Sequence, residues 1–301
     1  MKKEKCINQY IGNMFALYNG DSCEILKGMP SNSIHYSIFS PPFADLYTYS
    51  DSDRDLGNCK NQNEFYEHFK FIIKELYRVI MNGRLVSVHC MDLPTSKSRD
   101  GFIGLTDFPG LLIKLFQDEG FIYHSKVTIW KDPVVAMQRT KALGLLHKQL
   151  KKDSSMSRQG IADYIITFRK DGENEERITH TNENFTVDKW QEYASPVWLD
   201  INQSNTLQRT SAREQKDEKH ICPLQLDVIE RCIELWTNEN DIVLSPFAGI
   251  GSEIYQALLM KRRGIGIELK TSYYNQAVKN CINAETMPEQ QSIFEVLNDE
   301  L

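Results

Sequence analysis

Two short strings in this 301-residue chain combine residue types that can hold a planar amine and a cofactor. The first, Ser40-Pro41-Pro42-Phe43, follows the apolar run 34–39, and the second, Ser-Pro-Phe-Ala-Gly-Ile-Gly at 245–251, follows the apolar run 241–244. Each run predicts a strand, and residues just beyond the C-terminal end of a strand lie where α/β sheets bind ligands. We therefore interpret the two strings as the catalytic site and the cofactor loop of one enzyme.

The first string has the groups needed to activate an aromatic amine. The Ser40 hydroxyl and the Pro41 carbonyl can accept both N–H bonds of the amine, pull its nitrogen toward tetrahedral geometry and align it with a methyl donor. Pro41 and Pro42 fix the backbone dihedral φ, which limits flexing. The Phe43 ring can stack on an extruded base. The chemistry predicted is direct displacement of a methyl group from a sulfonium, with no cysteine nucleophile.

The second string predicts a nucleotide-binding turn. Gly249 and Gly251 permit a tight loop, and Glu268 ends the next predicted strand, where an acidic residue about 20 positions on can accept from both ribose hydroxyls. The loop lacks the third glycine of the G-x-G-x-x-G dinucleotide fingerprint and carries Glu253 beside that position, whose carboxylate is a poor neighbour for a pyrophosphate. A cofactor with one nucleoside and no phosphate fits better, and S-adenosylmethionine is such a cofactor.

Together the strings resemble those of the amino-group DNA methyltransferases, in which a D/N/S-P-P-Y/F/W string carries the target base and an F-x-G-x-G loop carries S-adenosylmethionine. The catalytic string precedes the cofactor loop, as in the family's β class, and the resemblance covers nearly the whole chain. It further implies that Asp21 lies near the cofactor and that the string 220–225 lines its methionine end. The implied cofactor-binding residues are Asp21, His220, Pro223, Ser245, Phe247, Ala248, Gly249, Gly251 and Glu268.

Two departures from the family pattern affect the expected contacts. The family's glycine loop usually opens with Asp, so with Ser245 one acidic contact to the cofactor is missing or replaced. Ser40 resembles the cytosine-N4 members, whereas Asp is usual in adenine-N6 members. We expect cytosine N4 as the target, with adenine N6 as the alternative.

Three other classes of protein are weighed against this interpretation. An RNA methyltransferase would share the chemistry. A protein-glutamine methyltransferase typically carries N-P-P-Y downstream of the cofactor loop, so the order found here argues against it. A non-catalytic DNA-binding module would not need both strings intact.

Composition sets limits on the partners. Seven scattered cysteines without a C-x-x-C pair predict reduced thiols and no metal site, in a cytoplasmic protein. The family resemblance implies that the protein is bacterial or phage-encoded. No apolar run approaches about 18 residues, so no membrane partner is expected. The net charge of −6 argues mildly against nucleic acid, but the run 139–158 is basic. We expect double-stranded DNA to contact Arg139, Lys148, Lys151, Lys152 and Arg158; a homodimer and a cognate restriction enzyme are further expected partners.

Strands that alternate with helices predict a Rossmann-like α/β fold, with a mostly parallel twisted sheet and helices on both faces. The expected helices are 63–81 (ended by Asn82-Gly83), 106–120, 226–236 and 252–261, and the further strands are 85–89, 121–130, 164–168 and 264–268. Periodicity fades from 171 to 219, where aromatic residues indicate a packed or binding segment. We expect a catalytic half (1–91), remaining elements with an irregular target-recognition insertion (92–218) and a cofactor half (219–301).

Overall fold

The computed structural model describes residues 6–42, 62–140, 143–207 and 223–298. Within them one sheet of nine strands has the order β1-β2-β11-β10-β3-β4-β8-β7-β9. Five neighbouring strands, β2, β11, β10, β3 and β4, run parallel to one another. β1 is antiparallel to β2, β8 is antiparallel to both β4 and β7, and β9 is parallel to β7. The predicted Rossmann-like, mostly parallel sheet is confirmed. The strand bounds are β1 Cys6–Ile11, β2 Phe15–Gly20, β3 Ile34–Phe39, β4 Ile80–Met91, β7 Ile122–Ile129, β8 Asp163–Arg169, β9 Val197–Trp198, β10 Ile242–Ser245 and β11 Arg263–Glu268.

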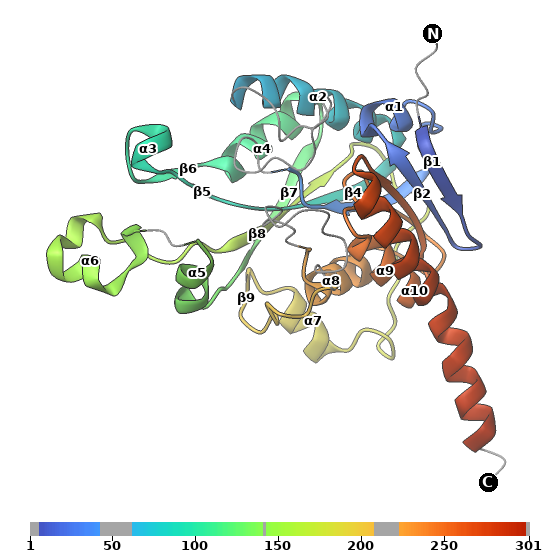
Figure 1. The fold of residues 1–301 in the computed structure, drawn as a ribbon. Helices are drawn as coiled ribbons and strands as arrows, with labels where there is room; N and C mark the ends of the chain where they lie inside the picture. The colour runs from blue at the N-terminus through green and yellow to red at the C-terminus, as the bar shows by residue number, and fades with distance from the viewer. Residues whose placement is uncertain (1–5, 43–61, 141–142, 208–222, 299–301) are drawn as a thin grey trace.

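Helices cover both faces of this sheet (Figure 1). On one face lie α1 (Ser22–Leu26), α2 (Gln62–Val79) and α4 (Phe108–Asp118), and on the other α8 (Leu226–Trp236), α9 (Ser252–Leu259) and α10 (Thr271–Asn298). Phe69 and Phe116 pack with Val88 in the first core, and Ile229 packs with Ile38 in the second. β3 is thus buried on both faces, which explains its continuous apolar sequence.

The end of α2 differs from the prediction. The helix stops at Val79 and the chain enters β4 at once, so Asn82-Gly83 lies inside the strand rather than after the helix. Ile80 pairs with Ile34 in the sheet, and these strand hydrogen bonds replace helical ones. Gly83 has φ +70° and its Cα approaches Asn174, so glycine serves a bend in β4 and not a helix cap.

Other predicted elements keep their places with small shifts at the ends. β3 has the predicted bounds, and Asp107 caps α4 by accepting from Gly110 N at 2.7 Å. The aromatic segment after 171 contains α7 (Val187–Tyr193) and β9. Tyr193 and Trp198 are buried, so the segment is packed at these residues, whereas Trp190 is 54% exposed. The prediction did not include β1, β2, α1 or α10; the last of these extends away from the body in Figure 1.

Two segments that connect strands, here called excursions, extend from the same end of the sheet. After β4 come β5 (Leu93–Pro94), α3 (Lys97–Asp100) and β6 (Leu105–Thr106); between β7 and β8 lie α5 (Pro133–Thr140) and α6 (His147–Lys152). In Figure 1 both stand out on one side of the molecule. Among the described residues, no helix combines the length and apolar character that crossing a membrane requires.

Candidate active site

The catalytic string begins where β3 ends. Pro41 is buried, and Ser40 and Pro42 are half-buried; Phe43 lies outside the described residues. β3 runs parallel to β10 on one side and to β4 on the other. Because parallel strands end at one edge of a sheet, Ser40 lies next to both the loop after β10 and the last residues of β4.

The glycine loop occupies that same edge and uses its two glycines differently. Gly249 has φ +53°, and a Cβ added there would meet no heavy atom within 4 Å, so its Cα faces open space. Gly251 has φ +87° and precedes α9, and a Cβ there would lie 3.1 Å from Cβ of Ala277. The first glycine can therefore admit a ligand, while the second allows α10 to pack closely.

The Glu268 carboxylate is held against this loop. Its Oε2 accepts from Gly249 N at 2.8 Å, and its Oε1 accepts from Lys270 N at 2.8 Å. Ala248, which is buried, donates its N–H to the carbonyl of Ile267 at 2.8 Å, so loop and strand are joined twice. The structure thus brings the glycine turn and the predicted ribose acceptor together.

Behind the loop, Ser245 and Glu253 are both buried. Burial raises the pKa of the Glu253 carboxyl to about 8; the Glu268 carboxylate adds to the rise, and the Ser245 hydroxyl opposes it. A carboxyl with this pKa is mostly neutral at pH 7. The inference that Glu253 would repel a phosphate therefore loses its electrostatic basis, because that inference assumed an ionised side chain.

The remaining predicted cofactor residues have mixed surroundings. Asp21 caps α1 by accepting from Cys23 N at 2.8 Å, and the neighbouring Ser22 Oγ donates to the carbonyl of Pro246 at 2.5 Å, which brings Asp21 to the glycine loop. The Phe247 ring packs on Phe39, with ring centroids 5.6 Å apart, and so belongs largely to the core. Pro223 is half-buried just before α8, and His220 lies outside the described residues.

A chain of polar side chains extends from Ser40 into the sheet, and sequence reasoning missed it. Ser40 Oγ lies 2.9 Å from Nδ1 of His89 on β4, and Nε2 of His89 lies 3.2 Å from Oδ2 of Asp163 at the start of β8. Lys131, just after β7, pairs with the other oxygen of Asp163. We name Ser40, His89, Asp163 and Lys131 the polar chain.

The two inner members of the polar chain are shielded from water, since His89 is 8% and Asp163 1% exposed. Burial alone would raise the pKa of Asp163, but His89 and Lys131 outweigh burial and hold that pKa below its ordinary value. Asp163 is therefore a carboxylate at neutral pH. The available sequence signal was the polar residues at the ends of apolar runs.

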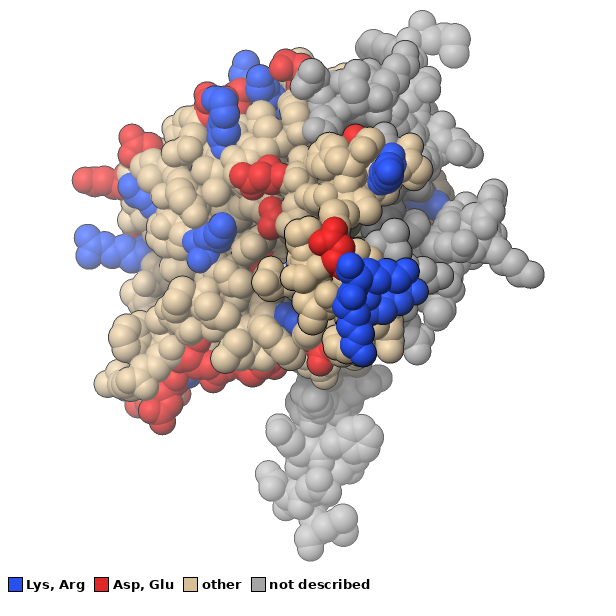
Figure 2. Space-filling view, turned by 90° about the vertical axis from the view of Figure 1, so that its left-hand side faces the viewer, with Lys and Arg blue, Asp and Glu red and all other residues tan. Residues whose placement is uncertain are grey.

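The predicted DNA-contacting residues belong to the excursion between β7 and β8. Lys148, Lys151 and Lys152 are exposed in α6, and Arg158 is half-buried after it. The side chain of Arg139, in α5, lies outside the described part of the chain. Figure 2 looks onto the side where this excursion stands out in Figure 1, and basic and acidic side chains are mixed there, with one compact basic group.

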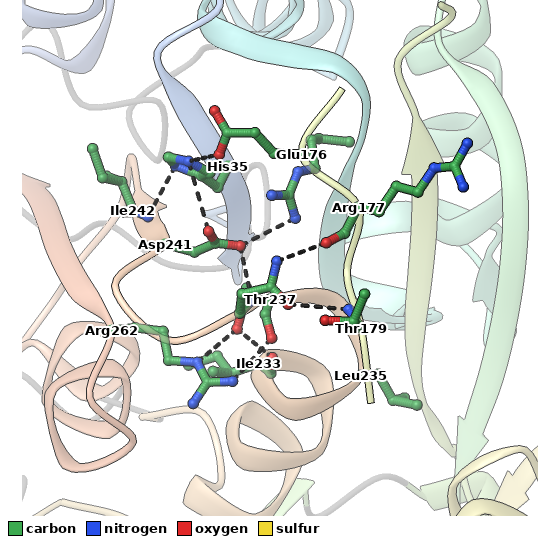
Figure 3. Close-up of polar contacts among 12 residues, drawn as sticks. His35, Glu176, Arg177, Thr179, Ile233, Leu235, Thr237, Asp241, Ile242 and Arg262 are labelled. Carbon is green, nitrogen blue, oxygen red and sulfur yellow. Dashed lines mark hydrogen bonds and ion pairs between the residues drawn. The ribbon is translucent and has the colours of Figure 1, made fainter. Parts of the chain in front are cut away.

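A second polar cluster lies at the opposite edge of the sheet (Figure 3). His35 Nε2 is 3.1 Å from Glu176 and 3.6 Å from Asp241, and these three side chains have the types that bind metals. His35 Nδ1, however, accepts from Ile242 N at 3.1 Å, so the neutral ring carries its proton on Nε2. That proton points at the two carboxylates, and Arg84 lies 3.1 Å from Asp241. The cluster is accordingly an internally paired ion network.

Comparison with known proteins agrees with this geometry. The profile of the N6/N4 DNA methylase family matches residues 34–279. The type II methyltransferase M.HindIII of Haemophilus influenzae (strain ATCC 51907 / DSM 11121 / KW20 / Rd) is 23% identical over 305 residues, covering 87% of this chain and 93% of that protein.

Solved structures share the fold. TTHA0409 of Thermus thermophilus, provisionally described as a DNA modification methylase, superposes with a TM-score of 0.66 at 19% identity, covering 90% of this chain and 96% of that one. PvuII DNA methyltransferase, described as cytosine-N4-specific, gives a TM-score of 0.64 at 17% identity over 90% of this chain and 87% of its own. The chain belongs to the DNA methylase family of N6 and N4 amino-group methyltransferases, enzymes that take their methyl group from S-adenosylmethionine.

Proposed function

We propose that this chain methylates the exocyclic amine of a base extruded from double-stranded DNA, and that the base is cytosine. The observation that carries the proposal is the position of Ser40, with its hydroxyl beside His89 and at the same sheet edge as the glycine loop. A hydroxyl proton engaged by His89 leaves the oxygen lone pairs of Ser40 to accept from an amine. Such acceptors align the nitrogen with a methyl donor.

The cofactor is assigned to the glycine loop. The open space at Gly249 and the fixed Glu268 carboxylate support a nucleoside there, with its ribose hydroxyls donating to Glu268. Asp21, next to the residue that bonds Pro246, is the further polar group that we assign to the cofactor. Ser245 is fully buried behind the loop and is assigned to its support. S-Adenosylmethionine supplies the methyl group when it is bound.

The choice of base rests on Ser40. Its neutral hydroxyl stands where a carboxylate is usual in adenine-N6 members of the family, and this favours cytosine N4. Adenine N6 is the alternative, because both amines have the same hydrogen-bond donors.

Duplex DNA is assigned to the edge from which the two excursions leave. Ile129 pairs with Asp163, so the segment 130–162 starts and returns directly beside the polar chain. The exposed lysines of α6 support phosphate contacts from this segment. We also propose that 92–218 contains target-recognition elements between a catalytic half (1–91) and a cofactor half (219–301). A homodimer and a cognate restriction enzyme remain predictions.

Transfer of labelled methyl from S-adenosylmethionine to duplex DNA, followed by separation of the nucleosides by mass spectrometry, tests the proposal. N4-methylcytosine is expected with wild-type protein, and Ser40→Ala should form it far more slowly. N6-methyladenine in its place would overturn the choice of base and leave the reaction class intact. Label in RNA or protein but not in DNA would show that DNA is not the substrate.

A further inference from the structure

The protonation pattern of the polar chain follows from its charges. Oδ2 of the Asp163 carboxylate lies 3.2 Å from Nε2 of His89, without hydrogen-bond alignment, and its negative charge favours the proton of the neutral imidazole on Nε2. Lys131 holds the other oxygen of Asp163 and fixes the direction of the carboxylate. Nδ1 then carries a lone pair and accepts a hydrogen bond from the Ser40 hydroxyl, whose Oγ lies 2.9 Å away.

Amine methylation produces a proton that must leave a partly closed site. The amine nitrogen forms a bond to the methyl carbon as the carbon–sulfur bond of the donor breaks, and that electron pair goes to sulfur. The nitrogen then bears a positive charge and must lose one proton to give the neutral methylamine. A neutral serine hydroxyl cannot keep this proton, unlike the carboxylate that other family members carry at the same position.

We propose that His89 is a positioning residue that removes this proton through Ser40. The methylated nitrogen gives a proton to Ser40 Oγ while the Ser40 hydroxyl proton passes to Nδ1 of His89. The imidazolium that forms faces Asp163, and water takes its proton before the next turnover. This role rests on the proposed amine methylation and assigns a function to His89 and Asp163 that the two sequence strings do not contain.

The charged and titratable groups around His89 come from three neighbouring segments. Ser40 follows β3, Asp163 begins β8, and Lys131 acts through Asp163. On β4 itself, the adjacent Cys90 is a buried thiol whose pKa burial raises. Within the described parts of the chain, the charged groups paired with His89 are therefore Asp163 and, through it, Lys131.

The experiment is single-turnover methylation of duplex DNA between about pH 5 and 8, where imidazoles change charge. His89→Asn keeps an acceptor oxygen for Ser40 but cannot take up a proton. His124→Asn, on β7, is the matched histidine control. We expect wild type and His124→Asn to gain rate as pH rises through this range, and His89→Asn to lose this dependence and about 10²-fold in rate. Cofactor affinity, measured by calorimetry, should stay unchanged.

Asp163→Asn is the second variant, because it removes the charge that favours the proton on Nε2; its rate should fall at least as far. A Ser40→Ala/His89→Asn double variant should be no slower than Ser40→Ala, since His89 acts only through Ser40. Wild-type rate and pH profile in folded His89→Asn would overturn the inference while the proposed function stands. Absence of methyl transfer to DNA by wild type would instead overturn the proposed function.

Discussion

The backbone N–H of Gly249 donates a 2.8 Å hydrogen bond to Oε2 of Glu268 and so joins the loop after β10 to the end of β11. Lys270 N holds the other carboxylate oxygen. Glu268 is therefore oriented before a cofactor arrives, and an oriented acceptor loses little conformational freedom on binding. A carboxylate oxygen has two lone pairs, so a bond from a backbone N–H does not by itself prevent a second bond from a ribose hydroxyl.

Glu268→Ala should weaken S-adenosylmethionine binding by roughly 1.5–3 kcal/mol, the range for hydrogen bonds to a charged group. Isothermal titration calorimetry measures the change. Glu239→Ala, an exposed carboxylate, is the control and should bind as wild type. Unchanged affinity in folded Glu268→Ala would place the ribose elsewhere.

Ser40→Ala should lower turnover on DNA by about 10²-fold or more, the scale of a lost proton-transfer partner. Cofactor affinity should stay near that of wild type, because Ser40 is assigned to the amine. Ser33→Ala is the matched control, since Ser33 immediately precedes β3 at its other end and its hydroxyl donates to the nearby carbonyl of Pro30. Equal rates in the two variants would move the catalytic site away from β3.

Replacing Lys148, Lys151 and Lys152 by Gln should weaken DNA binding and flatten its salt dependence. If each lysine neutralises one phosphate, the negative slope of log K against log salt becomes shallower by roughly 2 to 3. Lys261, Arg263 and Lys279, exposed around β11 and α10, form the charge-matched control triple. Affinities measured by fluorescence anisotropy at several salt concentrations decide the matter, and a wild-type slope would make the α6 lysines ordinary surface.

Asp241→Asn should destabilise the fold by about 3–5 kcal/mol, because it leaves the fully buried Arg84 guanidinium without its carboxylate. Glu176→Gln, at the exposed side of the same cluster, should cost only about 0–1 kcal/mol. Urea unfolding of both variants measures this difference. Similar losses of unfolding free energy in the two variants would show that burial does not determine how much each carboxylate of the cluster stabilises the fold.

Glu253 should make stability depend on pH. Its pKa rises from 4.5 in the unfolded chain to about 8 in the fold, chiefly through burial. Between these values the folded protein keeps a proton that the unfolded chain has lost, so the free energy of unfolding falls as pH increases. Above about pH 8 this loss is complete, on the order of 5 kcal/mol. Glu253→Gln should lack this decline in urea unfolding across the range; the same decline in both proteins would assign it to other groups.

The local sequence pattern was sufficient to predict the strands that precede the two strings. Continuous apolar runs predicted β3 and β10, since a strand buried on both faces needs no alternation, and Gly249 and Gly251 predicted a turn that requires positive φ. Asp107 and Gly120 bounded α4 for equally local reasons, a side-chain cap and a left-handed backbone. The predicted end of α2 was wrong because the pairing of Ile80 with Ile34 is a contact between residues far apart in the sequence.

By itself, the sequence determined the family, the order of the strings and the strand ends at which they lie, because these depend on neighbouring residues. Tertiary structure alone decided that His89, Lys131 and Asp163 meet behind Ser40, since each comes from a different strand end and the sheet order brings them together. It also decided that Glu253 is neutral rather than charged, because burial by distant segments sets the cost of ionisation. Residue type establishes which chemistry a side chain can perform, whereas packing establishes its hydrogen-bond partners and its protonation state.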